Sequence, residues 1–320
     1  MSTAKSKPWG AFLYADYRAL WVILIMGSIL SWMRILGTAQ WLLDETGSAY
    51  LVGLIGVVQL VVQIPVTLWA GNLADRMDRK KLMAYAYGTT TLVMTVLGVL
   101  EYQDALTPLF VYLGIAVMAG THMLASPARA AIVPIVVPKF DLMLAVSTDT
   151  ASSNAAAIAG PLLFAFVAVN FGSTEVFLTA AIIGSVAAML PLFVKAEGIA
   201  AGHDHSEVKP SQIQQTKAGF SYVSKHPILP GLFLLDIGIT TASFYREILP
   251  VLALGLFAGG ASATGMLGAA NSAGAILGSF VALLFVTYKA KGMLVLYASF
   301  AYGFILFGFG LANSLWMGLL

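Results

Sequence analysis

The chain has 320 residues, of which 59% are hydrophobic and only 10% are charged, and its formal net charge at pH 7 is +2. A soluble domain of this composition would have too little polar surface to cover itself, so the composition indicates a polytopic membrane protein. The small net charge argues against nucleic acid as a partner. The absence of cysteine excludes disulfides, thiolate metal sites and cysteine nucleophiles.

Apolar stretches that can cross a hydrocarbon core of roughly 30 Å follow one another along the chain. We predict spanning helices at residues 19–43, 51–70, 82–100, 106–137, 141–171, 176–194, 228–249, 264–286 and 293–311, and the first turns of another helix at 313–320. Between 195 and 227 the hydropathy falls, which predicts a linker whose second part is a short amphipathic helix. The predicted units are therefore residues 1–194, 195–227 and 228–320.

The distribution of Lys and Arg among the loops predicts the orientation of the chain. The short loops near residues 45, 102, 173 and 258 lack both residue types, whereas the N-terminus and the loops near 78, 139, 210 and 290 carry them. Because basic loops stay on the cytoplasmic side, we expect a cytoplasmic N-terminus.

A charged segment at residues 71–81, Gly-Asn-Leu-Ala-Asp-Arg-Met-Asp-Arg-Lys-Lys, separates the second and third apolar stretches. Six charges within seven positions must lie in water, so the segment is interpreted as a tight, turn-like hairpin. It resembles the signature loop between helices 2 and 3 of the major facilitator superfamily of secondary transporters. Asp78 stands where many members have a second glycine, which predicts a less tight turn.

That resemblance implies a gating role for the loop. In the family, the aspartate at position 75 caps a helix terminus of the other bundle in the outward-facing state, and the arginines pair with neighbouring acids. The residues of this chain to which the role is carried are Gly71, Asp75, Arg76, Arg79 and Lys80.

Further stretches resemble one branch of the superfamily, the bacterial exporters that include enterobactin and macrolide efflux proteins. They lie at residues 31–34, 39–42, 46–48, 127–134, 160–161, 222–223 and 226–227. The resemblance implies two six-helix bundles that rock about a central cavity in the bacterial inner membrane and export amphipathic compounds against proton entry. Gly160 and Pro161 match the core of the antiporter motif of exporters, and together they permit a helix bend.

An internal repeat supports this architecture. At an offset of 212 positions the matches include Arg34 with Arg246, Gly53 with Gly265, and Gly56 with Gly268. The first three and the last three complete spans therefore read as parallel copies. The fold class that we predict is an all-α polytopic membrane protein with the major facilitator fold, a six-helix N-terminal bundle and a C-terminally incomplete second bundle, with about nine complete spans and the start of a tenth. The alternative is a natural nine-helix protein.

Five ionisable residues fall inside predicted spans, namely Arg34, Arg129, Asp149, Asp236 and Arg246. An ionisable group inside a membrane costs at least a few kcal/mol and persists mainly where it faces a cavity or a partner. Arg129 and Asp149 lie at similar depth on neighbouring spans, so we expect them to pair. Asp149 or Asp236 is the candidate proton carrier; the alternative for Asp149 is a static ion pair.

The repeat-equivalent Arg34 and Arg246 belong to the two helices that line the cavity in this superfamily. Two guanidiniums facing one another would bind a carboxylate, phosphate or catecholate group, which suggests an anionic or zwitterionic substrate. The alternative is that Arg246 snorkels to the surface and is neutralised by Glu247. Gln40 and Gln63 fall in apolar spans, where they contact substrate or bridge helices.

The sequence contains no phosphate-binding loop and no nucleophile with a base, so we predict neither an enzyme nor a cofactor site. His203 and His205 in the linker could ligate a metal, but their spacing makes a weak site and we predict none. The predicted function is proton-coupled export of small amphipathic molecules such as drugs or siderophores by a monomer in contact with membrane lipids. The alternatives are a lysophospholipid or lipid transporter of the same fold and a non-transporting truncated membrane protein.

Overall fold

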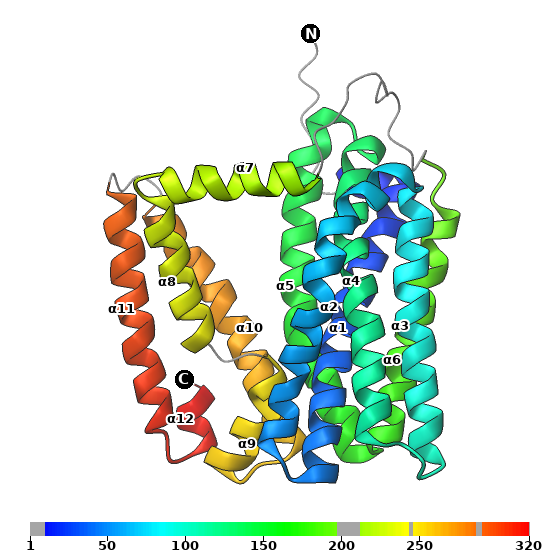
Figure 1. Ribbon diagram of the computed structural model, residues 1–320. Helices are drawn as coiled ribbons and strands as arrows, with labels where there is room; N and C mark the ends of the chain where they lie inside the picture. The colour runs from blue at the N-terminus through cyan, green and yellow to red at the C-terminus, as the bar shows by residue number, and fades with distance from the viewer. Residues whose placement is uncertain (1–9, 197–211, 243–245, 286–289, 320) are drawn as a thin grey trace.

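The structure of the chain is a computed structural model that describes residues 10–196, 212–242, 246–285 and 290–319. Within these ranges the backbone alone is described at 68–76, 122–127, 212–216, 218, 241–242, 283 and 291. Every regular element in the described part is a helix (Figure 1). The predicted all-α class is therefore confirmed.

The first group of helices consists of a short 3-10 helix, six long helices and a closing 3-10 turn. Their bounds are η1 Gly10–Leu13, α1 Ala15–Thr46, α2 Ala49–Arg76, α3 Arg79–Tyr102, α4 Pro108–Val136, α5 Lys139–Asn170, α6 Ser173–Met189 and η2 Leu190–Phe193. We call α1–α6 the first bundle.

The remaining elements follow residue 211. They are α7 Gln212–Lys225, α8 Leu229–Ala242, η3 Arg246–Ile248, α9 Leu249–Phe257, α10 Ala261–Leu284, α11 Lys291–Gly310 and α12 Leu315–Leu319. We call α8–α12 the second group. The predicted amphipathic helix of the linker is confirmed as α7.

Seven helices in the described part are long and apolar enough to cross a membrane: α1, α2, α3, α5, α6, α10 and α11. Helices α4 and α8 are apolar over the shorter stretches Pro108–Thr121 and Leu229–Thr240. The chain is thus a multi-pass membrane protein.

The connections between the spans lie at two opposite ends of the molecule (Figure 1). The end that holds the turn at residues 77–78 and helix α7 is called the basic end. The end that holds the turns at 47–48, 103–107 and 258–260 is called the acidic end. These names refer to the sequence of the loops and not to a side of the membrane.

The signature turn is shorter than the sequence predicted. Helix α2 continues to Arg76 and α3 begins at Arg79, so only Met77 and Asp78 are non-helical. The side chain of Asp78 accepts a hydrogen bond from the backbone N–H of Lys80 at 2.9 Å. Asp78 therefore acts as the N-cap of α3. A glycine at this position would have no side chain to accept that hydrogen bond.

Two clusters of buried apolar side chains hold the molecule together. One lies towards the basic end and includes Tyr17, Ile132 and Val194, all in or next to the first bundle. The other lies towards the acidic end and runs from Trp41 on α1 to Leu267 on α10. The core of the first bundle thus continues into the second group through the second cluster.

The predicted single helix at 228–249 is wrong. Helix α8 ends at Ala242, and after residues 243–245 the chain forms the η3 turn and then the separate helix α9. Pro250 lies in the first turn of α9, where its missing backbone N–H costs nothing. The same proline inside a continuous helix would remove a hydrogen bond.

Candidate functional site

A cluster of polar and charged side chains lies where the second group contacts the first bundle. It consists of Trp32 and Arg34 on α1, Gln59 on α2, and Arg246 and Glu247 on η3, and we call it the inter-bundle cluster. Arg34 is 7% exposed and Glu247 is 8% exposed. Two ionisable groups are therefore almost entirely removed from solvent at this contact.

Specific contacts hold the cluster together. The amide nitrogen Nε2 of Gln59 donates to Oε1 of Glu247 at 3.1 Å. The guanidinium carbon of Arg246 lies 4.3 Å from the ring centroid of Trp32, which is a cation–π contact. The charges of Glu247 and Arg246 both act on Arg34. Each of these interactions joins η3 to the first bundle.

The chemistry of the inter-bundle cluster follows from its charges. The buried Arg34 and Glu247 carry opposite charges, and the exposed Arg246 beside them adds one positive charge. An anion that enters the cluster would compensate this charge. The planar guanidiniums can bind a carboxylate or phosphate through two parallel hydrogen bonds. The cluster is therefore suited to an anionic group.

Arg246 does not have the position that the repeat predicted. It lies on the η3 turn, and its side chain is exposed and stacks on Trp32. Arg246 was expected inside the single span 228–249, and that part of the expectation is wrong, because the residue lies on the η3 turn directly before α9. Both arginines nevertheless belong to the same contact, since Arg246 stacks on Trp32, which is two residues from Arg34 on α1.

A second polar link between the two groups lies nearer the acidic end. Thr264 on α10 donates its hydroxyl hydrogen to Oε1 of Gln40 at 2.8 Å. Gln40 in turn donates from Nε2 to Oδ1 of Asp44 at 2.8 Å. Gln40 is 6% exposed and its hydrogen bond with Thr264 joins α1 to α10. This is the helix-bridging role, the second of the two roles expected for Gln40.

The Gly-Pro motif of α5 lies at a three-helix contact. A Cβ added at Gly160 would lie 2.7 Å from Cβ of Trp32, so the glycine permits α1 and α5 to approach closely. Pro161 faces α10, where a Cβ added at Gly268 would lie 2.9 Å from Cβ of the proline. Small residues allow this kind of close helix packing in membranes.

The predicted pairing of Arg129 with Asp149 is confirmed. Nη1 of Arg129 lies 2.7 Å from Oδ2 of Asp149. The hydroxyl of Tyr17 on α1 donates to the other carboxylate oxygen, Oδ1, at 3.0 Å. Asp149 is thus held from α1 and from α4, entirely within the first bundle.

Asp236 and Gln63 lie apart from these contacts. Asp236 is exposed on α8, and Gln63 is partly buried on α2, one helical turn from Gln59. The structure therefore brings together Arg34, Arg246 and Gln40 at the contact between the two groups, and Arg129 with Asp149 inside the first bundle. It does not bring Asp236 to either place.

The residues of the signature loop contact the backbone. Nη1 of Arg79 donates to the carbonyl oxygen of Ala131 at 3.2 Å, and Nζ of Lys80 donates to the carbonyl oxygen of Val194 at 3.2 Å. Arg79 thus binds a helix carbonyl where the resemblance implied an acid. The side chains of Gly71, Asp75 and Arg76 lie outside the described residues, as do His203 and His205.

Three residues in these contacts have no site role predicted from the sequence, namely Tyr17, Trp32 and Thr264. Glu247 was expected only to neutralise Arg246, although it carried a usable signal, because it is an acid in an apolar stretch, next to an arginine. A threonine or an aromatic residue in a spanning helix is too common to single out.

Comparisons with known proteins agree with this architecture. A family model described as transmembrane secretion effector, within the major facilitator superfamily, matches residues 6–320. The chain is also similar to a protein of Staphylococcus aureus (strain NCTC 8325 / PS 47) named Staphyloferrin A transporter. The two are 27% identical over 284 residues, which cover 87% of this chain and 69% of the relative.

Proposed function

Because this chain belongs to the transmembrane secretion effector family of the major facilitator superfamily, whose members are transporters, we propose that it exports small amphipathic molecules in exchange for protons. The observation that carries the proposal is the inter-bundle cluster. Its buried charges lie where the second group meets the first bundle, which is where a transporter of this fold changes its conformation.

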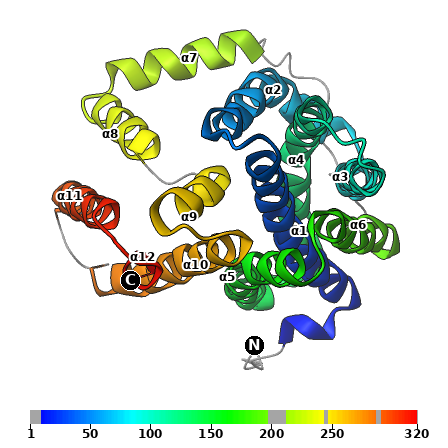
Figure 2. The same ribbon diagram turned by 90° about the horizontal axis from the view of Figure 1, so that it is seen from below.

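The arrangement of the helices supports a rocking mechanism. The links Gln40–Thr264 and Gln59–Glu247 lie towards the acidic end. At the basic end, α8 and α11 stand away from the first bundle (Figures 1 and 2). With the basic end in the cytoplasm, as the Lys and Arg distribution predicts, this arrangement is the inward-facing state of the cycle.

For the substrate we propose an amphipathic molecule with an anionic or zwitterionic group. Arg34 and Arg246 supply the positive charge, and Trp32 beside them supplies an apolar surface. The relative that is named for the siderophore staphyloferrin A makes siderophores the first substrate class to test.

For the proton carrier we propose Asp236. Both carboxylate oxygens of Asp149 are occupied, one by Arg129 and one by Tyr17, so this residue fits the static role that was its alternative. Asp236 is exposed on α8. When water reaches that face of α8, the carboxylate can exchange protons with it.

The proposal is tested in vesicles that contain the purified protein and an entrapped pH dye. Under a pH gradient, addition of siderophores or amphipathic drugs should produce a substrate-dependent proton flux. Asp236→Asn should abolish that flux while substrate binding persists, and Asp104→Asn, in the acidic-end turn at 103–107, serves as the matched control. A normal flux in Asp236→Asn would remove this residue from the mechanism. The absence of any substrate-dependent flux in the unaltered protein would refute proton-coupled transport.

We also propose the domain division, the oligomeric state and the location of the protein. The functional units are residues 1–194, 195–227 and 228–320, the protein acts as a monomer, and its location is the bacterial inner membrane with the N-terminus inside. Because the chain has no cysteine, single cysteines in the basic and acidic loops can report the orientation by labelling from either side.

A further inference from the structure

Helix α7 lies across the direction of the spanning helices at the basic end of the molecule (Figure 1). Its C-terminal residue Lys225 is separated from the first residue of α8, Leu229, by only three residues. Since α8 is an apolar helix that enters the membrane, α7 lies at the level where the hydrocarbon core begins. Seen along the spanning helices, α7 lies at the rim of the molecule (Figure 2).

Side-chain contacts of His226 order the corner between α7 and α8. Nδ1 of His226 accepts hydrogen bonds from the backbone N–H groups of Ile228 at 3.2 Å and Leu229 at 3.3 Å. The rings of Tyr222 and His226 lie 5.8 Å apart. The side chain of His226 therefore satisfies two backbone donors at the start of α8. These contacts fix the level of α7 relative to the span that follows it.

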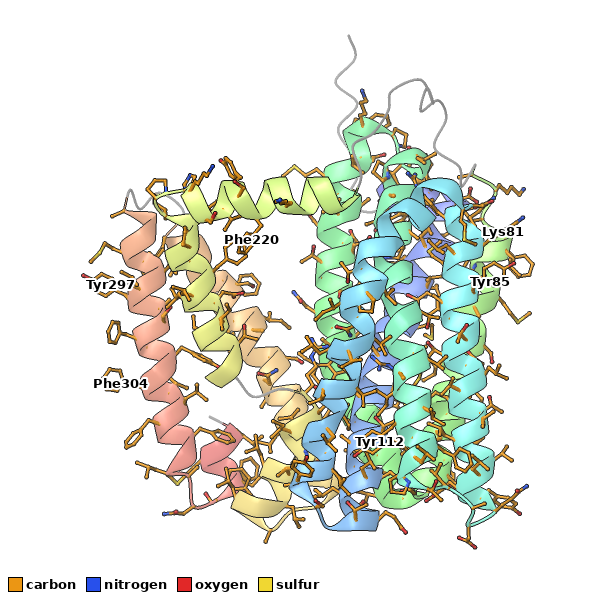
Figure 3. All side chains as sticks on the ribbon, in the orientation of Figure 1. Lys81, Tyr85, Tyr112, Phe220, Tyr297 and Phe304 are labelled. Carbon is orange, nitrogen blue, oxygen red and sulfur yellow. The ribbon has the colours of Figure 1, made fainter. Side chains whose placement is uncertain are left out.

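The side chains of α7 divide into an apolar and a polar side. Phe220 is 76% exposed, and it is drawn on the side of α7 towards the spanning helices (Figure 3). Tyr222 is 66% exposed and, at 3.6 residues per turn, lies about 160° around the helix from Phe220. Among the described helices α7 is the most strongly amphipathic. A large aromatic ring is thus exposed at the level of the membrane boundary.

The charges of this segment are all positive. Lys209, Lys217 and Lys225 fall between Glu207 and Asp236, a stretch without any acidic residue. Lys217 and Lys225 are exposed. Basic residues beside an apolar helix face are typical of helices that lie in the interface of a membrane with anionic lipids.

We propose that α7 is an interfacial anchor that binds anionic phospholipid. Phe220 inserts between the acyl chains, and Lys217 and Lys225 bind the phosphate and other anionic groups of the lipid headgroups. The level of α7, its exposed aromatic ring and its purely positive charge all fit one partner, the anionic surface of the membrane in which α8 is embedded.

The test uses the whole chain, which has no cysteine and accepts single cysteines as sites for a fluorescent label. Labels are placed at Phe220→Cys, at Tyr222→Cys on the opposite side of α7, and at Phe304→Cys on the lipid-facing α11, where Phe304 is 75% exposed. The protein is reconstituted in nanodiscs of phosphatidylcholine with or without phosphatidylglycerol. Quenching by brominated lipid and quenching by aqueous iodide are measured for each label.

We expect the label at 220 to be quenched by brominated lipid and protected from iodide, like the label at 304, and the label at 222 to behave in the opposite way. The lipid-inserted fraction should rise with phosphatidylglycerol. Lys217→Gln and Lys225→Gln should each reduce that gain about fivefold in the insertion equilibrium, because a basic residue near an anionic surface contributes about that factor.

Three results would overturn the proposal. Equal iodide quenching at 220 and 222 would place α7 in water. Protection of the label at 220 from both quenchers would place Phe220 against protein. Insertion that is the same in both lipids, and unchanged by the two lysine substitutions, would show that headgroup charge plays no part.

Discussion

At the scale of single residues, the contact of Arg129 and Tyr17 with Asp149 decides how the first bundle tolerates a charge in its interior. The arginine and aspartate side chains are 15% and 11% exposed. Breaking a buried pair is more harmful than replacing both partners, since it leaves one charge without compensation.

Arg129→Met should therefore lower the free energy of unfolding by about 3–5 kcal/mol. Tyr17→Phe should lower it by about 1 kcal/mol, because one hydrogen bond is lost while the ring remains. The double variant Arg129→Met with Asp149→Leu should lose less than Arg129→Met alone. Urea unfolding in detergent micelles measures all of these values.

The control for this series is Arg18→Met, which removes an exposed arginine from the same membrane protein. A surface substitution of this kind stays within about 0.5 kcal/mol of the original stability. If Arg129→Met were no more harmful than Arg18→Met, the ion pair would have no structural role.

At the scale of elements, the contact between α5 and α10 depends on glycines. A Cβ added at Gly265 would lie 2.5 Å from the carbonyl oxygen of Pro161 and would also clash with Cβ of Ala165. The repeat-equivalent Gly53 on α2 has nothing within 4 Å of the same added atom. The two copies of the repeat thus offer a matched pair of positions.

Gly265→Ala should destabilise the protein by about 1–3 kcal/mol, because the obstacle is backbone and cannot rotate away. Gly53→Ala should leave the stability unchanged or raise it by up to about 1 kcal/mol, since alanine favours helix over glycine. Thermal unfolding of the two variants under the same conditions makes the comparison. An equal effect at both positions would mean that the α5–α10 approach is not as close as described.

Much of the element scale follows from hydropathy, because a spanning helix needs a long apolar stretch and little else. The spans of α1, α3, α5 and α10 begin and end within a few residues of their predicted limits. The separate helix that begins at Leu249 was not predicted, although the charged Arg246 and Glu247 lower the hydropathy directly before it. Pro250 was the available signal for a new helix start.

The candidate site was less predictable than the spans. The pairing of Arg129 with Asp149 follows from depth alone, because both lie inside the same bundle. Arg246 could not be placed, because its position depends on how the second group docks on the first. The contact of Thr264 with Gln40 joins residues that are far apart in sequence, so no local sequence pattern could predict it.

At the scale of the whole molecule, two polar links towards the acidic end hold the second group against the first bundle. They are the hydrogen bonds from Gln59 to Glu247 and from Thr264 to Gln40. The acidic-end apolar cluster continues across the same contact. Opening of the acidic end must break both hydrogen bonds, whereas the ion pair inside the first bundle stays intact.

Gln59→Leu combined with Thr264→Val should shift the population towards an arrangement that is open at the acidic end. Each lost hydrogen bond contributes about 1 kcal/mol, or roughly a fivefold change in the ratio of the two states. Spin labels at Tyr50→Cys on α2 and Leu256→Cys on α9, both exposed positions near that end, report the change as longer distances in double electron–electron resonance.

Gln63→Leu, one helical turn from Gln59, is the control, because none of the hydrogen bonds between the two groups involves its side chain in the described residues. Its distance distribution should match that of the unaltered protein. If the double variant gave the same distribution as Gln63→Leu, the two links would not hold the acidic end closed.

Hydrogen bonds with α1 and α3 hold the chain at residues 194–196, where it leaves the first bundle. Oδ2 of Asp16 accepts the backbone N–H groups of Lys195 at 3.1 Å and Ala196 at 2.8 Å, while Lys80 donates to Val194. Hydrogen bonds to charged groups contribute about 1.5–3 kcal/mol each, so this joint does not swivel freely. A movement of the second group that reaches Ala196 would therefore act on Asp16 of α1 and, through Val194 and Lys80, on the start of α3.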